Sequence, residues 1–236
     1  MSHHITRLLL FDIDRTLLAA GGAGFRAINR AFAELYGLED ATEGIIPDGK
    51  TDPMLFREAM ARIEGTDRLD GPAISRLTQR YIELLPEELT APPARLMPGV
   101  RSLLEALAAE PAVLMGLVTG NLEQTAYAKL RLFGLDRFFT IGAFGSDSGD
   151  RLELPPIAVR RAETKAGSRL AFRDVTIVGD TPRDVACALA WGAKAVGVAT
   201  GRSSCQELHD AGADVVFGDL SDTDAVLEAL LPPTGP

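Results

Sequence analysis

The stretch that decides the fold is LLLFDIDRTLL, residues 8–18. Its first four residues are apolar and predict a short buried strand. Asp12 and Asp14 follow where that strand ends, and because alternate side chains of an extended chain point the same way, both carboxylates can face one site. Ligands gather at the carboxyl ends of strands in open parallel sheets. One carboxylate can therefore attack a phosphorus centre while the other handles a proton; the alternative is that the two acids only cap a turn.

Further apolar runs predict the rest of a sheet. They are short, mostly lack alternation of apolar and polar residues, and are separated by helical segments: residues 113–118, 138–141, 175–178, 195–198 and 214–217. This pattern is typical of a parallel sheet that is covered on both faces. Residues 8–11 belong to the same sheet, so the sequence predicts an α/β fold.

An all-helical insertion interrupts this pattern after the first strand. Helical periodicity marks three segments: residues 25–36, 52–63 and 73–89. Gly37 is a stop signal for the first helix, and Asp52 is the predicted N-cap of the second, with Pro53 in its first turn. Residues 90–93 form a predicted linker. We therefore expect a core of residues 1–18 and 95–236, with a helical domain of residues 19–94 inserted into it.

Composition excludes several classes of partner. The chain has 236 residues, a net charge of −9 and an isoelectric point of about 4.9, so it offers no basic stripe for nucleic acid or for an anionic membrane. No apolar run approaches the roughly 20 residues of a membrane span. Cys187 and Cys205 lack metal-ligand spacing, and we see no signal peptide. We expect a cytoplasmic protein that acts as a monomer or homodimer.

The turn Thr119-Gly120-Asn121 follows the predicted strand 113–118. Asn121 can cap the next helix. The Thr119 hydroxyl and the N–H groups of Gly120 and Asn121 can cradle a phosphate where that helix begins. The alternative is an ordinary helix cap.

Asp180 and Asp184 follow the predicted strand 175–178, with Pro182 opening a helix between them. Carboxylates at a strand end suit Mg²⁺, a hard cation that takes a few protein oxygens and keeps several waters. The alternative is a pair of acids that complement the helix dipole. Asp184 fits that alternative better than Asp180, which directly follows the strand.

A phosphoryl site also needs a cation to neutralise charge in the transition state. Arg151 stands just before a helix, on the side of the sheet where the acids gather. Lys165 lies near the end of the same helix, where a cation suits the helix C-terminus. We favour Arg151.

With these motifs in this order, the chain resembles the haloacid dehalogenase-like hydrolase superfamily. Asp12, Asp14 and Thr16 match its first motif, Asp-x-Asp-x-Thr, and Thr119 matches the second. The fourth motif, Gly-Asp-x-x-x-Asp, is matched by the two acids of residues 179–184. The helical insertion resembles the small cap of phosphoglycolate phosphatase-like members. The resemblance implies a Rossmann-like core, Mg²⁺ dependence and a covalent aspartyl-phosphate.

The resemblance also implies the roles of individual residues. Asp12 is the expected nucleophile, and Asp14 is the general acid/base whose backbone carbonyl touches the metal. The expected metal site comprises Asp12, Asp14, Asp180 and Asp184. The expected substrate-binding residues are Thr16, Thr119, Gly120, Asn121 and Lys50, the last from a loop of residues 48–52 that resembles the substrate-facing loop of such caps. That loop has a plainer interpretation, a solvated segment ending in an N-cap.

Two residues depart from the family pattern. Arg15 replaces the usual Gly, so its side chain can perturb the loop or reach toward the cap. Arg151 aligns with a position that is usually Lys and presents a planar, bidentate fork instead.

The expected function is Mg²⁺-dependent hydrolysis of a small phosphorylated metabolite. The resemblance implies that dehalogenase and phosphonatase members lack the second Asp, so Asp14 argues against those chemistries. A phosphomutase or phosphotransferase remains an alternative, and stimulation by a bisphosphate would reveal it. A phosphate-binding protein without turnover is another alternative, motivated by Arg15 and Arg151; a phosphatase assay with and without EDTA separates it from an enzyme.

Overall fold

The computed structural model describes residues 5–63, 71–90 and 94–231. Six parallel strands form its central sheet, in the order β5-β4-β1-β6-β7-β8. Their bounds are β1 Arg7–Phe11, β4 Val113–Thr119, β5 Gly142–Phe144, β6 Val175–Gly179, β7 Lys194–Val198 and β8 Val215–Phe217. The predicted α/β class with a Rossmann-like parallel sheet is confirmed.

One predicted strand, residues 138–141, is wrong. A 3-10 turn, Asp136–Phe138, ends there, and the edge strand β5 begins only at Gly142. Phe139 is buried because its ring packs edge-on against Phe11, with the ring centroids 5.9 Å apart. Only Ile141, the last residue of the run, bonds to the sheet, where its carbonyl accepts the Leu117 N–H at 3.2 Å, so the rest of the run reflects burial by packing.

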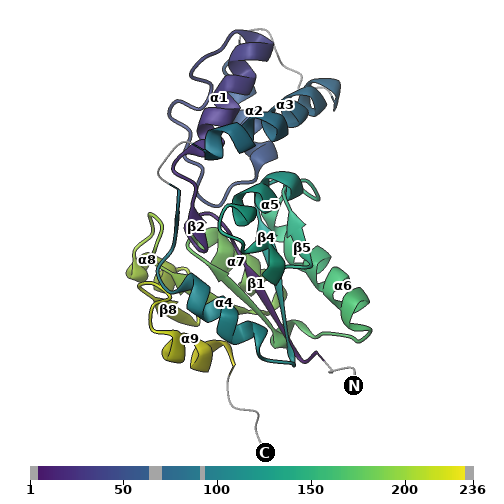
Figure 1. Cartoon of the computed structure of the whole chain (residues 1–236), viewed down its shortest axis with the longest axis vertical. Coiled ribbons are helices and arrows are strands. Elements are labelled where there is room, and N and C mark those ends of the chain that lie inside the picture. The colour runs from purple at the N-terminus through teal and green to yellow at the C-terminus, as the bar shows by residue number, and fades with distance from the viewer. Residues whose placement is uncertain (1–4, 64–70, 91–93, 232–236) are drawn as a thin grey trace, which may run out of the picture.

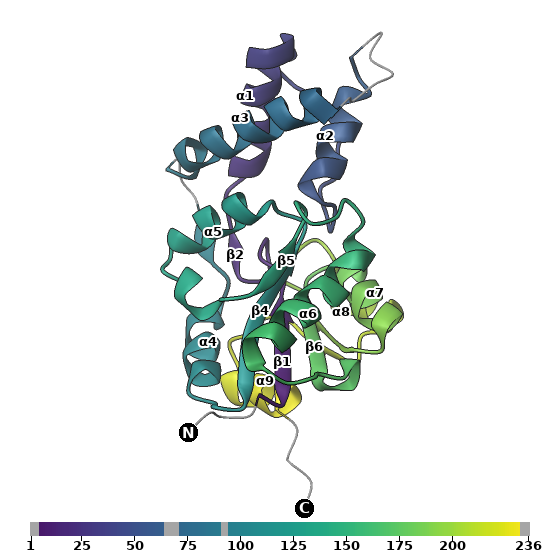
Figure 2. The same cartoon turned by 90° about the vertical axis from the view of Figure 1, so that its right-hand side faces the viewer.

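Helices cover both faces of the sheet (Figure 2). One face carries α4 (Val100–Ala108), α5 (Glu123–Arg131) and α9 (Thr223–Leu230), and the other carries α6 (Leu154–Ala166), α7 (Pro182–Trp191) and α8 (Cys205–Asp210). The alternation of β1 explains this arrangement, because Leu9 and Phe11 pack into the first helical face and Leu8 and Leu10 into the second. The short 3-10 turns Arg151–Glu153 and Phe172–Asp174 precede α6 and β6.

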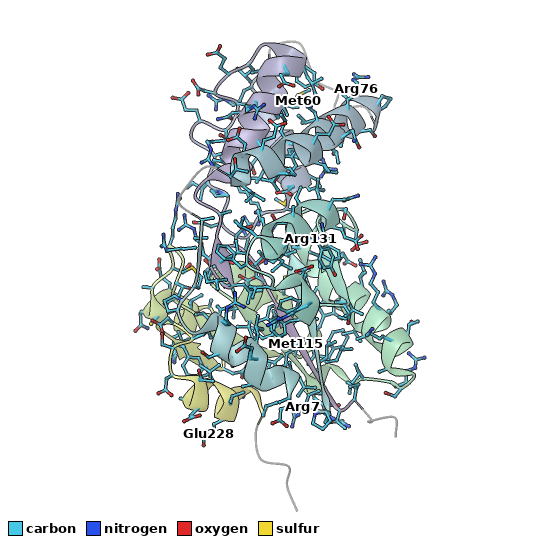
Figure 3. All side chains as sticks on the ribbon, viewed as in Figure 1. Arg7, Met60, Arg76, Met115, Arg131 and Glu228 are labelled. Carbon is cyan, nitrogen blue, oxygen red and sulfur yellow. The ribbon has the colours of Figure 1, made fainter. Side chains whose placement is uncertain are left out.

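A separate helical layer lies beyond the carboxyl ends of the strands (Figure 1). It contains α1 (Ala23–Tyr36), α2 (Asp52–Met60) and α3 (Gly71–Leu89). Gly37 ends α1 with a left-handed φ of 69°, as its position predicts. Figure 3 labels Met60 in this layer and Met115 in the sheet below; both side chains are buried.

The predicted start and end of the second helix need correction. The N-cap is Thr51, whose hydroxyl accepts the Met54 N–H, whereas Asp52 is already helical. The helix ends at Met60 and does not reach Ile63. Of the predicted linker, Thr90 lies in a turn that follows α3, and residues 91–93 lie outside the described residues.

The two connections between the helical layer and the sheet run side by side. β2 (Leu18–Ala19) pairs antiparallel with β3 (Arg95–Leu96), so the chain leaves and re-enters the sheet region at one place. Within the described ranges, no helix combines the length and the apolar character that crossing a membrane requires.

Candidate active site

Three neighbouring strands bring polar residues to one edge of the sheet. Asp12 follows β1, Thr119 ends β4 and Asp180 follows β6, and all three side chains are buried. They meet because β1 lies between β4 and β6. The N–H of Asp12 donates to the carbonyl of Val178 at 2.9 Å, which extends the β1–β6 pairing to the first acid.

Arg151 links two of the acids. One of its nitrogens, Nη2, lies 2.8 Å from Oδ1 of Asp12 and 2.5 Å from Oδ1 of Asp184. Asp184 also caps α7, because its Oδ2 accepts the N–H and the hydroxyl of Thr181. Asp184 therefore lies in the first turn of α7, as the helix-dipole interpretation expects, and also forms an ion pair. Lys165 is exposed in the last turn of α6, so the structure brings Arg151 to the acids and leaves Lys165 away from them.

The buried acids form a set that fits a divalent cation. Asp12, Asp180 and Asp184 each offer an oxygen within 4.8 Å of the others. Burial, together with neighbouring carboxylates, raises the pKa of Asp180 to about 9, and burial raises the pKa of Asp12 to about 6 although Arg151 opposes it. Neighbouring buried carboxylates resist ionisation because their negative charges repel one another. A hard cation such as Mg²⁺ binds carboxylate oxygens and offsets this repulsion.

Two residues support Asp180. The Thr16 hydroxyl donates to Oδ1 of Asp180 at 3.3 Å, and Thr16 is fully buried. Gly201 touches the other side of this carboxylate, since a Cβ atom at Gly201 would lie 1.8 Å from Oδ2 of Asp180. Thr16 thus faces the acid cluster, and it does not line the adjoining cavity.

Asp14 turns away from the three acids to a cation that the sequence analysis missed. Nζ of Lys129 lies 2.6 Å from Oδ2 of Asp14 and 2.6 Å from Oδ1 of Asn121. Asn121 in turn donates to Asp14 at 2.8 Å and to the Thr119 hydroxyl at 2.8 Å. Burial opposes ionisation of Asp14, but Lys129 outweighs it and holds the pKa of Asp14 below its ordinary value.

A signal for Lys129 was present in the sequence. Leu122, Ala126 and Leu130 form the buried side of α5, and Lys129, three residues after Ala126, falls on that side. A lysine in an apolar stripe needs a buried partner. The partner is not visible in the sequence, because Asp14 is 115 residues away.

The helical layer caps α5 in place of Asn121. Oδ2 of Asp52 accepts the Leu122 N–H at 3.0 Å, and the Asp52 N–H donates to the Gly120 carbonyl at 2.7 Å. Gly120 is required here, since a Cβ atom would lie 2.1 Å from the Lys50 carbonyl oxygen. The expected cap, Asn121, is instead committed to Asp14 and Thr119. Burial raises the pKa of Asp52 to about 6.

A cavity of about 530 Å³ lies between the sheet edge and the helical layer. The predicted site residues line it, apart from Thr16 and Asp184. Lys50 reaches it from the loop before α2, with Nζ held 2.6 Å from Glu58 of the same layer. Arg15 also lines the cavity and has a left-handed φ of 66°. Residues from both parts of the chain therefore enclose one space beside Asp12 and Asp14.

Comparison with known proteins agrees with this arrangement. The sequence model of the haloacid dehalogenase-like hydrolase family matches residues 9–198. The chain is 27% identical over 219 residues to a phosphoglycolate phosphatase of Haemophilus influenzae strain 86-028NP, covering 91% of this chain and 95% of that protein. It is 27% identical over 226 residues to the phosphoglycolate phosphatase of Pasteurella multocida, covering 94% and 98%.

A solved structure shares the fold. The crystal structure of a predicted phosphoglycolate phosphatase from Haemophilus somnus 129pt superimposes with a TM-score of 0.68 at 22% identity, covering 94% of this chain and 98% of that one. Since the family match spans most of the sequence and includes the strands that carry the acids, the chain belongs to the haloacid dehalogenase-like hydrolases.

Proposed function

We propose that the protein is a Mg²⁺-dependent phosphatase that hydrolyses a small phosphorylated metabolite through an aspartyl-phosphate on Asp12. The observation that carries the proposal is that two acids one residue apart are each paired with a different cation. Asp12 pairs with Arg151 and Asp14 pairs with Lys129, at one end of a single cavity. Relatives that are named phosphoglycolate phosphatase support a phosphate monoester as substrate.

In the first step Asp12 attacks phosphorus, and the bond from phosphorus to the leaving oxygen breaks. The pKa of about 6 leaves Asp12 mostly ionised at neutral pH, as a nucleophile must be. Asp14, which Lys129 holds mainly ionised, must first take up a proton from solvent, which it then gives to the leaving oxygen. Arg151 offsets the negative charge that would otherwise keep the Asp12 carboxylate from a phosphate dianion.

In the second step a water molecule attacks the phosphorus of the aspartyl-phosphate. Asp14 accepts a proton from that water, and the phosphorus–oxygen bond to Asp12 breaks, which restores the carboxylate. The hydroxyl of Thr119 and the N–H groups of Gly120 and Asn121 hold the phosphoryl oxygens throughout. Inorganic phosphate then leaves.

The metal site would comprise Asp12, the backbone carbonyl of Asp14 and Asp180, with Asp184 and Thr16 holding the carboxylates in place. A bound Mg²⁺ supplies positive charge that stabilises the phosphoryl oxygens. The cluster of Asp12, Asp180 and Asp184 supports this assignment, because these three buried carboxylates otherwise repel one another.

We propose that residues 19–94 act as a cap over a core of residues 1–18 and 95–236. Thr51 and Asp52 of this cap bond to the carbonyls of Gly149 and Gly120, so these bonds join the helical layer to the sheet edge. Closure of this kind excludes water from the reacting groups and lets the cap contact the rest of the substrate. We expect the enzyme to act in the cytoplasm.

The test is phosphate release from p-nitrophenyl phosphate in Mg²⁺ and in EDTA, with wild type and Asp12→Asn. Wild type should turn over only with Mg²⁺ and should form a phosphoryl adduct that mass spectrometry detects after acid quenching. Asp12→Asn should do neither, because an amide cannot form the acyl-phosphate. Metal-dependent turnover by a pure, folded Asp12→Asn protein contradicts the mechanism, and stimulation of wild type by a sugar bisphosphate would identify phosphoryl transfer instead.

A further inference from the structure

The charges at the reacting end of the cavity are already paired. Arg151 pairs with Asp12, and Lys129 pairs with Asp14. Both cations are buried and held by these acids, which leaves neither free for a distant part of a ligand. Any charge selectivity toward the remainder of a substrate must come from other residues that line the cavity.

Three arginines line one other wall of this cavity: Arg15, Arg95 and Arg202. Arg95 begins β3, opposite Ala19 of β2, and the Arg15 N–H donates to the Leu18 carbonyl of the same two-stranded ribbon at 2.7 Å. The Thr200 hydroxyl donates to the Arg15 carbonyl at 2.5 Å, which brings the loop of Arg202 to this wall. The arginines therefore gather where the chain passes between the sheet and the helical layer.

These arginines form no close ion pair among the described residues, although Arg15 lies near enough to Asp14 for its charge to act on that carboxylate. Among the described residues, no carboxylate forms an ion pair with Arg15 or Arg95, and the carboxylate nearest to Arg202 is Asp48, at 3.8 Å. Cations that line a cavity without a carboxylate partner provide an anion-binding surface.

The backbone of Arg15 adds an independent observation. Among the described residues, Arg15 is the only non-glycine residue with a positive φ, 66°. Such a conformation costs energy for any residue that has a Cβ atom, and glycine adopts it freely. Strain of this kind concentrates at binding and catalytic sites, where the side chain that causes it is needed.

Apolar side chains also line the cavity. Phe25, Ile28 and Leu55 come from α1 and α2, and Met97 lies just after β3. The volume of about 530 Å³ lies within the range of sites for complete small molecules, and a two-carbon acid such as glycolate would leave most of it empty. The cavity thus offers room, apolar side chains and further cations in addition to the residues of the phosphoryl site.

We propose that the substrate is an extended phosphate monoester whose leaving group has an apolar body and ends in a second anionic group, a carboxylate or a phosphate, bound by Arg15 and Arg95. The assignment rests on the proposed phosphatase function for the position of the phosphoryl group. It names Arg15 and Arg95 as specificity residues.

Binding of two phosphonates, which cannot be hydrolysed, tests the subsite without turnover. Benzylphosphonate and 4-(phosphonomethyl)benzoate differ only in a terminal carboxylate. Isothermal titration calorimetry in Mg²⁺ should show that wild type binds the carboxylate compound at least about tenfold more tightly. A hydrogen bond between charged groups contributes a preference of this size. Arg15→Gly should reduce this preference to less than about threefold, and Arg95→Ala should weaken it. Arg169→Ala, which removes an exposed arginine outside the cavity, should keep it.

The controls separate this inference from the proposed function. Arg15→Gly should fold at least as stably as wild type, because glycine relieves the positive φ, and thermal melting verifies this. The subsite is overturned if wild type binds the two phosphonates equally, or if the preference survives in Arg15→Gly. If wild type releases no phosphate from any ester but keeps the preference, the phosphatase proposal fails and the anionic subsite stands.

Discussion

Nζ of Lys129 lies 2.6 Å from Oδ2 of Asp14, with the Lys129 side chain only 5% exposed. The contact joins helix α5 to the loop after β1 and includes the side-chain oxygen of Asn121. It holds the Asp14 carboxylate on Lys129 and Asn121, apart from the cluster of Asp12, Asp180 and Asp184. We therefore regard Lys129 as a positioning residue for the proposed general acid/base.

Replacing Lys129 with Met should change the pH dependence of turnover. Lys129 lowers the pKa of Asp14, and Asp14 must carry a proton to assist the leaving group, so kcat/KM should fall with rising pH across the range in which Asp12 is ionised. Lys129→Met raises the pKa and should move this fall to higher pH, while loss of positioning lowers the maximal rate about ten- to a hundredfold. Lys129→Arg should restore part of both effects. A pH profile that is unchanged in Lys129→Met would remove Lys129 from this role.

Substitution of Arg151 should reduce turnover strongly, whereas substitution of Lys165 should have little effect. Arg151→Ala should reduce kcat about 100- to 1000-fold, as loss of a transition-state charge partner does. Arg151→Lys should recover part of the loss, because the charge returns without the planar guanidinium whose Nη2 contacts both Asp12 and Asp184. Lys165→Ala should change kcat less than about twofold, because Lys165 is exposed at the helix C-terminus.

Stability must be checked in the same variants. Arg151→Ala leaves Asp12 and Asp184 buried without their cation, and breaking a buried ion pair costs about 3–5 kcal/mol. Circular dichroism melts show whether the protein is folded at the assay temperature. An inactive but folded Lys165→Ala together with an active Arg151→Ala would show that the wrong cation was assigned.

Asp180→Asn should raise the thermal stability in EDTA and reduce the further stabilisation that Mg²⁺ provides. The pKa of Asp180 is raised to about 9, so its ionised form is unfavourable in the folded protein without metal. Removing the carboxyl should raise Tm by a few degrees in EDTA, since about 1 kcal/mol shifts Tm by about 2–4 °C in a chain of this size. The rise in Tm that millimolar Mg²⁺ gives wild type should shrink in the variant, with Mg²⁺ half-saturation at least about tenfold higher. An unchanged Mg²⁺ response would exclude Asp180 as a ligand.

Asp52 should make the stability of the fold depend on pH. Burial raises its pKa to about 6 in the folded protein, from an ordinary value of 3.8. Below pH 4 both states carry the proton. As pH rises from about 4 to 6 the unfolded chain ionises first, so the free energy of unfolding falls by about 3 kcal/mol and then stays level.

Asp52→Asn should remove this dependence and keep an acceptor for the Leu122 N–H. Its free energy of unfolding in urea should exceed that of wild type above pH 6 and equal it below pH 4. Asp210→Asn, an exposed acid-to-amide change, serves as the control and should match wild type throughout. If Asp52→Asn and wild type run parallel from pH 4 to 7, the folded-state pKa of Asp52 is close to its ordinary value.

The sequence by itself determined the fold class and the positions of the acids. The apolar run before Asp12 and the one before Asp180 predict strands, and both lie in the sheet within a residue of their predicted ends. Gly37 ends α1 as predicted. These features depend on local rules, because burial of a strand and the left-handed freedom of glycine are written into neighbouring residues.

Only the tertiary structure decided which charges meet. Lys129 and Asp14 are 115 residues apart, and Arg151 and Asp12 are 139 apart, so no periodicity connects them. Asp52 caps a helix of the sheet region because the helical layer lies on Gly120, a contact that no motif in its own segment reveals. A buried charge is stable only beside an opposite charge or a hydrogen-bond partner, and that partner is selected by the packing of distant segments.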